Sequence, residues 1–277
     1  MVRLIAGLVG LFFSGMLLIS FVTGAYTAVT EPVAPTVESQ FLKHPKKVSF
    51  KHDGPFGSYD KAQLQRGLKV YAEVCSACHS LNQVAFRNFE DLGYSEDEVK
   101  AIAKGWKTEV PSINPETGEP ATRPGLPSDK LPSPYANETA ARAANNNALP
   151  PDLSLMTKAR HNGTAYVYSL LTGYQAVPAT LPKENRPGTG LHYNPYFANL
   201  NLAMAPPLTG DDQVTFDDGT KATKDQMAKD VAAFLTWTAE PKMEARKTAG
   251  WASLIFLIIF TALCYLSYRT IWADKKH

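Results

Sequence analysis

The chain has 277 residues, of which 20 are proline and 3 are cysteine, and it carries a formal net charge of +2. Its 28 basic side chains are balanced by 26 acidic ones, so we expect no basic face of the kind that binds nucleic acid. An apolar run lies near each end of the chain. The roughly 220 residues between these runs are enough for one domain with its own core.

The first apolar run covers residues 4–22 and follows a single positive charge at Arg3. It is similar to a secretory signal, but it is longer than a usual signal core, and residues 24–28 form a poor cleavage pattern. We predict that residues 1–28 are retained as an uncleaved signal anchor, with a cleaved signal sequence as the alternative. In both cases residues 29–247 form a domain outside the cytoplasmic membrane.

A helix is predicted to begin after Asp60, because aspartate favours the N-cap position. Leu64, Leu68, Tyr71 and Cys75 follow at spacings of three and four, so they share one side of this helix. The helix therefore faces the core along that side, and its end places the segment that follows next to the core.

That segment, Cys75-Ser76-Ala77-Cys78-His79, has the C-x-x-C-H pattern of covalent c-type haem attachment. Its thiols lie about one helical turn apart, so both reach the vinyl groups of one porphyrin, and the histidine offers its imidazole to the iron. The alternatives are a zinc knuckle and a thioredoxin-like redox pair. Zinc needs about four ligands, whereas Cys264 lies in the distant apolar run, and a redox pair leaves His79 without a role. We predict one haem c, attached through Cys75 and Cys78.

Four further helices are expected in the middle of the chain. Ser95 with Glu98, and Thr223 with Gln226, form the pattern of a capping box. Asp152 is expected to cap the second of these helices. The expected helices cover residues 95–103, 153–160, 164–171 and 223–240, and Pro241 ends the last of them.

Long connections join these helices. Nine prolines between residues 111 and 151 exclude regular helix or sheet over much of that region. A small hairpin is expected where Val214-Thr215-Phe216 is followed by Asp218-Gly219.

The second apolar run, residues 249–268, has about 20 residues without a charge, enough to cross the hydrocarbon core of a membrane as one helix. A buried helix of a soluble protein is the alternative. Trp251 and Trp272 would lie near the two interfaces. We predict an anchor helix over residues 248–272 and a cytoplasmic tail over 273–277. The positive charges that place this end inside are Arg269, Lys275 and Lys276.

The iron of a c-type haem either takes a sixth ligand or leaves that position open. Met204 suits this role because it lies in an irregular segment that Pro206 and Pro207 stiffen, whereas the other methionines lie in apolar runs or on or beside helices. His192 and His161 are the alternatives. With both axial positions filled, the iron has no vacant site for oxygen or peroxide, so the chain is expected to carry electrons.

These motifs, in this order, resemble the cytochrome c1 family, the haem subunits of the cytochrome bc1 complex (ubiquinol–cytochrome c oxidoreductase, complex III), in its bacterial type. The resemblance covers nearly all of the domain between the two apolar runs. The segments most specific to this family are Pro150-Pro151-Asp152-Leu153-Ser154 and Met204-Ala205-Pro206-Pro207-Leu208. The others are Arg66-Gly67 with Tyr71, the C-x-x-C-H motif, and residues 141–146, 158–161, 169–174 and 194–197.

The resemblance implies a mainly α fold, a class I cytochrome c-like helical domain around one c-type haem with long proline-rich loops. A C-terminal transmembrane helix and an N-terminal signal or anchor helix flank this domain. Met204 is then the distal ligand, and Arg160 pairs with a haem propionate. A glycine is expected within residues 198–201, where this chain has Ala-Asn-Leu-Asn. The other positions that match the haem pocket are Asn145, Pro151, Tyr166, Leu170, Leu171, Phe197, Leu202 and Pro207.

The resemblance also implies a role. Beside cytochrome b in a dimeric multi-subunit complex, the chain takes electrons from the Rieske iron–sulfur protein and passes them to a soluble or membrane-bound cytochrome c. It is no enzyme by itself, but an electron-transfer subunit of a respiratory or photosynthetic chain. The implied location is the bacterial inner membrane, with the haem domain in the periplasm and the C-terminus in the cytoplasm.

Two other classes of protein share some of these features. One is a membrane-anchored cytochrome c that serves a terminal oxidase or a dehydrogenase, and the other is a haem enzyme, such as a peroxidase, with an open sixth position. Acidic groups could steer a basic cytochrome c to the surface or could simply form a solvated face. The acidic groups considered are Glu96-Asp97-Glu98, Asp211-Asp212 and Asp217-Asp218.

Overall fold

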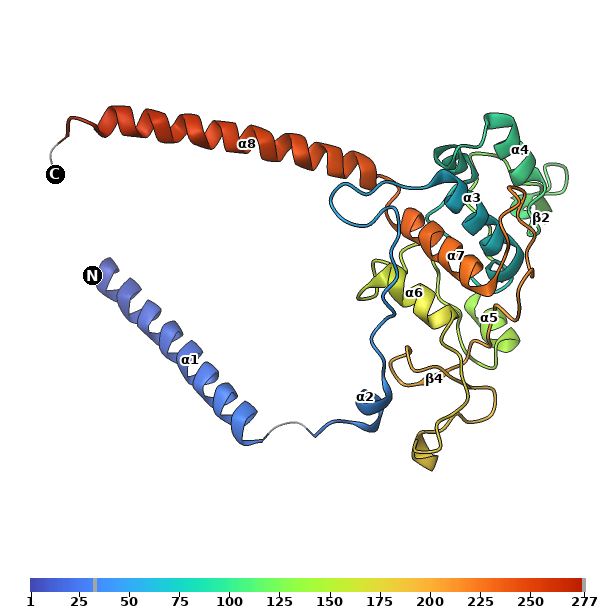
Figure 1. The fold of residues 1–277 in the computed structure, drawn as a ribbon, viewed down its shortest axis with the longest axis horizontal. Coiled ribbons are helices and arrows are strands. Elements are labelled where there is room, and N and C mark those ends of the chain that lie inside the picture. The colour runs from blue at the N-terminus through green and yellow to red at the C-terminus, as the bar shows by residue number, and fades with distance from the viewer. Residues whose placement is uncertain (32–33, 276–277) are drawn as a thin grey trace. The chain divides into compact units, whose positions relative to one another are not determined.

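The computed structural model describes residues 1–31 and 34–275 (Figure 1). Residues 32–33, within the expected outer domain, and residues 276–277, which include Lys276 of the expected tail, lie outside the described residues. The chain divides into two compact units, the first from Met1 to Phe41 and the second from Leu42 onwards.

The first unit contains the N-terminal apolar run as one helix. This helix, α1 (Val2–Thr30), has no buried residue, and a short helix, α2 (Val37–Phe41), follows it. By length and composition α1 can cross a membrane, and the same holds for α8 (Met243–Trp272) in the second unit. Both apolar runs are therefore helical over their whole length, as predicted.

The second unit is mainly helical, as the fold class predicts, with two small antiparallel pairs of strands, β1 with β2 and β3 with β4. Its helices are joined by long irregular segments. Before α8 its elements, in chain order, are α3 (Lys61–Val70), the π-helical turn η1 (Tyr71–Cys75), the 3-10 helix η2 (Phe86–Leu92), α4 (Glu96–Lys104), β1 (Val110–Ile113), β2 (Pro120–Arg123), α5 (Glu138–Ala144), α6 (Gly163–Leu171), the 3-10 turn η3 (Lys183–Asn185), β3 (His192–Tyr193), β4 (Asn201–Leu202) and α7 (Lys224–Ala239).

The centre of this unit is the contact between α3 and α7, which lie side by side (Figure 1). Asp60 caps α3 by accepting a hydrogen bond from the Gln63 amide, as expected. Gly67 lets the two backbones approach closely, because a Cβ atom there would lie 2.2 Å from the carbonyl oxygen of Asp230. The Tyr71 ring packs on Phe234 of α7, with 5.9 Å between the ring centroids. The start of the C-x-x-C-H motif is thus fixed against α7.

A buried ion pair ties the same two helices together. Asp230 on α7 is fully buried, and its carboxylate accepts a hydrogen bond from Arg66 Nε at 2.8 Å. Gln63 and Gln226 donate to the same carboxylate, so the buried charge is both paired and hydrogen-bonded. Because Gln226 bonds Asp230 instead of the backbone of Thr223, α7 has the predicted N-cap at Thr223 but no reciprocal capping box. The capping box predicted for α4, Ser95 with Glu98, is present.

Two sequence predictions for the loops are wrong. The expected helix over residues 153–160 is a series of turns, because the Asp152 carboxylate bonds the amide of Ser154 and thereby closes a local turn. The expected hairpin after Val214 forms no strands. Val214 and Phe216 are buried, but Asp218 bonds Arg66 and the Thr220 amide instead of closing a hairpin turn. The proline-rich region is irregular over much of its length, as predicted, and contains the short elements β1, β2 and α5. Pro111 lies within β1 opposite Thr122, where the two-stranded sheet leaves an open edge for a residue without an amide N–H.

We predict that Gly67→Ala strongly destabilises this unit. The added methyl group would lie 2.2 Å from the Asp230 carbonyl oxygen and 2.6 Å from Cβ of Phe234, so α3 and α7 have to separate. The free energy of unfolding should fall by about 3 kcal/mol, measured by urea unfolding of the haem-loaded chain in detergent. Gly188→Ala is the control, because nothing lies within 4 Å of a Cβ atom there, and it should change stability by less than about 0.5 kcal/mol. Equal stability of the two variants would contradict the close crossing.

Candidate haem-binding site

The C-x-x-C-H motif begins in a π-helical turn at the end of α3. The Ser76 amide donates to the Tyr71 carbonyl at 2.8 Å, which widens the last turn of the helix. The chain then tightens, and the amides of Cys78 and His79 both donate to the Cys75 carbonyl, at 3.1 and 2.9 Å. Cys75 and Cys78 are therefore the first and fourth residues of one tight turn, as the predicted attachment to a single porphyrin requires.

The imidazole of His79 is oriented by the protein. Its Nδ1 lies 2.8 Å from the carbonyl oxygen of Pro151, and since a carbonyl only accepts hydrogen bonds, Nδ1 carries the proton. The lone pair is then on Nε2. Burial lowers the pKa of His79, which also favours the neutral ring. The Tyr71 hydroxyl donates to the His79 carbonyl at 2.8 Å and fixes its backbone. These residues fit a haem iron, because metal-ligating histidines generally donate their second ring N–H to such an acceptor.

The cysteines do not form a redox pair or a zinc site in this structure. All three are free, and burial raises the pKa of Cys75 to about 12, whereas a reactive thiol needs a lowered pKa. Across residues 1–31 and 34–275, no group of three or more His, Cys, Asp or Glu side chains lies close enough to hold a metal ion. Cys264 is exposed on α8. The donor set therefore fits attachment through thioether bonds with a single histidine ligand from this segment.

Asp152 clamps the segment after His79 to the segment that orients it. Its carboxylate accepts hydrogen bonds from Ser80 Oγ at 2.8 Å and from the amides of Asn82 at 2.7 Å and Ser154 at 2.9 Å. The Leu153 amide donates in return to the Ser80 carbonyl at 2.9 Å. The carbonyl of the neighbouring Pro151 is thereby held in place for His79. The sequence suggested Asp152 only as a helix cap, so this function was missed.

Met204 packs against the same hydrophobic core as Cys75 and Tyr166. Its backbone is held by the Tyr174 hydroxyl, which donates to the Met204 carbonyl at 2.9 Å. Of the two alternative ligands, His192 lies in β3 opposite Leu202, and His161 is exposed in the turn before α6. The structure thus brings Met204 to the core that carries the attachment motif.

The other predicted pocket residues lie on several elements. Leu170 and Leu171 are on α6, Leu202 is on β4, and Phe197 and Pro207 are half-buried in the loops around β4. Asn145 is held by hydrogen bonds from its side chain to Tyr135 and to the Ala141 carbonyl. Arg160 is exposed, and its Nη1 bonds only the neighbouring Ala159 carbonyl among the contacts that the structure gives it.

Within residues 198–201, where a glycine is expected, Leu200 has the backbone conformation that glycine usually adopts. Leu200 has a φ of 65°, the left-handed conformation that glycine adopts without strain. Its side chain is fully buried, and its backbone exchanges hydrogen bonds with Asn194 and Phe197, which fix the turn. Burial of the leucine side chain therefore offsets a conformational cost of about 1 kcal/mol or more.

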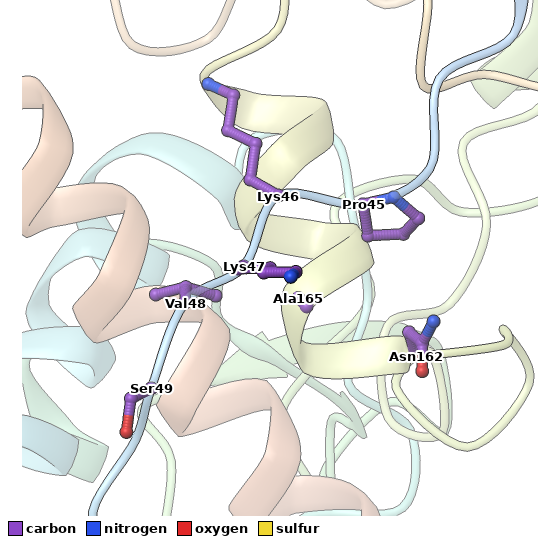
Figure 2. Close-up of a pocket in the computed structure, with 7 residues that line it drawn as sticks. All are labelled: Pro45, Lys46, Lys47, Val48, Ser49, Asn162 and Ala165. Carbon is purple, nitrogen blue, oxygen red and sulfur yellow. The ribbon is translucent and has the colours of Figure 1, made fainter.

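A surface hollow of about 460 Å³ lies elsewhere, between α6 and the extended segment before α3 (Figure 2). Its lining consists of residues 45–49 with Asn162 and Ala165, and includes no part of the C-x-x-C-H motif. Lys46 extends away along α6, where its Nζ donates to the Thr172 carbonyl and hydroxyl. Lys46 thus secures this segment to α6.

The oriented histidine, the two cysteines of the C-x-x-C-H motif and the long apolar helices together define a membrane-anchored c-type cytochrome. The profile of the cytochrome C1 family matches residues 50–275, and the chain belongs to this family. It is 47% identical over 236 residues to "Cytochrome c1" of Rhodospirillum rubrum, covering 81% of this chain and 86% of that protein.

Two mitochondrial relatives match to a similar degree. "Cytochrome c1, heme protein, mitochondrial" of Saccharomyces cerevisiae is 47% identical over 236 residues, covering 84% of this chain and 74% of that protein. "Cytochrome b-c1 complex catalytic subunit, mitochondrial" of Candida albicans is 44% identical over 237 residues, covering 84% and 79%. Family membership makes the chain a c-type haem electron carrier and a subunit of the cytochrome bc1 complex, as the resemblance implied.

We predict that Asp152→Asn destabilises the site in a pH-dependent way. Burial opposes the charged form, but the hydrogen bonds from Asn82, Ser154 and Ser80 together lower the pKa of Asp152. Because its folded pKa is lowered, the carboxylate stabilises the fold above about pH 4, and this contribution disappears as the pH falls through the folded pKa.

At neutral pH the variant should lose about 2 kcal/mol of unfolding free energy, and the difference from the wild type should shrink in acid. Urea unfolding at several pH values measures this. Asp91→Asn, an exposed aspartate, is the matched control and should change little. A difference that stays constant from neutral to acidic pH would rule out the clamp.

Proposed function

We propose that this chain binds one haem c through Cys75 and Cys78, with His79 and Met204 as axial ligands. We further propose that it takes electrons from the Rieske iron–sulfur protein and passes them to a cytochrome c. The hydrogen bond from His79 Nδ1 to the Pro151 carbonyl carries the proposal, because it sets the tautomer and direction of the imidazole in advance.

The residues of the chain perform three tasks in this proposal. Haem c, when bound, supplies reversible one-electron chemistry at its iron. His79 is held neutral with Nε2 free, and Asp152 keeps its partner Pro151 in place. Tyr174 holds the backbone of Met204, whose thioether favours the reduced iron and a high midpoint potential. Apolar side chains from α6 and the loops around β4 exclude water.

Arg160 is the proposed partner of a haem propionate. Its guanidinium is exposed and bonds only its own neighbouring carbonyl among the contacts that the structure gives it, so its other N–H groups face solvent. Bidentate pairing with a carboxylate suits this group. The remaining pocket residues proposed to line the haem are Asn145, Pro151, Tyr166, Leu170, Leu171, Phe197, Leu202 and Pro207.

The acidic runs give limited support for docking a basic cytochrome c. Asp217 and Asp218 pair with Lys69 and Arg66, at 2.7 and 2.6 Å. Lys100 pairs with the first two residues of the run at 96–98, and the third closes the capping box of α4. Much of this negative charge is neutralised within the chain, so the docking surface is proposed to lie around the haem edge, without a dominant acidic patch.

For location, we propose the bacterial inner membrane, with residues 29–247 in the periplasm. Residues 1–28 form a signal sequence or uncleaved signal anchor. Residues 248–272 of α8 cross the bilayer, and the first turn of α8, residues 243–247, lies outside it. The charges Glu244, Arg246 and Lys247 precede the apolar run, and Arg269 and Lys275 follow it. Cytochrome b and a second copy of the complex are the proposed neighbours, and residues 273–277 are the cytoplasmic tail.

Purification of the chain in mild detergent through a C-terminal tag tests the proposed route. Cytochrome b and the Rieske protein should co-purify, and added quinol should reduce the c haem in an inhibitor-sensitive reaction. Selective removal of the Rieske protein should abolish this reduction, and an added cytochrome c should then no longer be reduced by quinol. Co-purification with an oxidase or a dehydrogenase instead would overturn the assigned partners.

Met204→Leu tests the proposed distal ligand. Loss of the thioether should lower the midpoint potential by on the order of 0.1 V or more and should admit carbon monoxide to the reduced iron. A redox titration and carbon monoxide difference spectra measure these changes. Met156→Leu is the control, because Met156 packs against the same core and should leave both properties as in the wild type. A wild-type potential in Met204→Leu would show that another residue is the ligand.

A further inference from the structure

The loop from Lys51 to Tyr59 is fastened to the beginning of α8 (Figure 1). The Tyr59 amide donates to Glu244 Oε1 at 2.6 Å, and its hydroxyl donates to the Glu240 carbonyl at 2.9 Å. Lys247 reaches back from α8, and its Nζ donates to the carbonyls of His52 and Gly57, at 2.8 and 2.9 Å. Contacts at both ends thus hold the loop against the helix.

The tip of this loop presents an aromatic ring to the surroundings. Phe56 is 80% exposed, and its ring stacks on Trp251 of α8 with 4.8 Å between centroids and 2° between planes. The Trp251 indole N–H donates to the Pro55 carbonyl at 3.3 Å. Gly54, with a φ of 70°, provides the turn that brings the tip to this position. The chain thus builds an exposed aromatic pair and leaves it uncovered.

The position of this pair along α8 is informative. The charge-free run of residues 249–268 is about 30 Å long as a helix, which equals the thickness of the hydrocarbon core. Trp251 lies at the outer end of that run, about one turn beyond the charges of Arg246 and Lys247. Phe56 stacks on it and therefore lies at the same level, where the headgroups meet the hydrocarbon.

We propose that the loop of residues 51–59 is a second membrane contact, in which Phe56 and Trp251 together enter the headgroup region of the bilayer crossed by α8. Tryptophan favours this region because its ring is apolar and its N–H is polar, and an exposed phenylalanine ring at the same level is an apolar group that enters toward the acyl chains. The Trp251 N–H already has its acceptor within the protein, so insertion leaves no indole donor unpaired. The proposal rests on α8 crossing the membrane and goes beyond the proposed haem and electron partners.

Site-specific photocrosslinking tests the contact in the assembled complex. Benzoylphenylalanine replaces Phe56 in membranes that contain the haem-loaded chain, and mass spectrometry identifies the product after illumination. A lipid adduct at position 56 is expected. The same label at Ile113, which is 68% exposed on β1, is the negative control and should give no lipid adduct. A label at Ile258, in the middle of α8, reports whether α8 is embedded in the membrane.

Each outcome decides the proposal. A lipid adduct at position 56 supports it. An adduct with another subunit of the complex overturns it in favour of a protein interface, and the absence of any adduct at 56 shows that the tip lies in water. If position 258 also fails to react with lipid or with a neighbouring transmembrane helix, the membrane assignment of α8 fails as well, which separates the two failures.

Lys247→Met tests whether the loop is held at the membrane by its bonds to α8. The variant loses the donor to His52 and Gly57, so the yield of lipid adduct at position 56 should fall several-fold. Lys242→Met, which removes the same charge from an exposed residue just before α8, is the control and should leave the yield unchanged. Equal yields in the two variants would show that the loop does not need this fastening.

Discussion

The hydrogen bond between His79 and the Pro151 carbonyl is the interaction on which the rest of the site depends. A histidine that only follows two cysteines in sequence has no fixed ring orientation. Here the acceptor belongs to a different segment, and the Asp152 carboxylate joins the two segments by accepting hydrogen bonds from Ser80 Oγ and the Asn82 amide. The imidazole is therefore held by the tertiary structure, and its direction does not have to be created when an iron atom is bound.

The contact between α3 and α7 fixes the chain just before His79 and so supports this arrangement. Gly67 allows the helices to approach, the Arg66–Asp230 pair is buried between them, and Tyr71 contributes both a ring to the core and a hydroxyl to His79. The motif thus begins on the best-packed part of the unit. Residues around Met204 lie in loops instead, where a single hydroxyl, that of Tyr174, holds the backbone of the proposed ligand.

Local patterns predicted the parts of the fold that depend on local physics. The helix expected over residues 164–171 is present as α6. The two apolar helices follow from long runs without charge, and the Asp60 cap and the α4 capping box follow from capping chemistry. The C-x-x-C-H motif indicated the attachment site for the same reason. The turns at residues 153–160 come from a local bond between the Asp152 carboxylate and the Ser154 amide that competes with the helix. The bond of Asp218 to Arg66, which replaces the hairpin, joins partners far apart in sequence, as do the bonds that give Asp152 and Tyr174 their functions. Such partners have no local signature.

The link between the haem domain and its anchor is short. Only Glu240, Pro241 and Lys242 separate α7 from α8, and the loop of residues 51–59 is hydrogen-bonded to Glu244 and Lys247 in the first turns of α8. A domain joined in this way has little freedom to tilt or swing about its anchor. With α8 in the bilayer as proposed, the haem-binding site is held at one height and in one orientation relative to the membrane. Large movements during electron transfer then belong to the proteins proposed to supply and accept the electron.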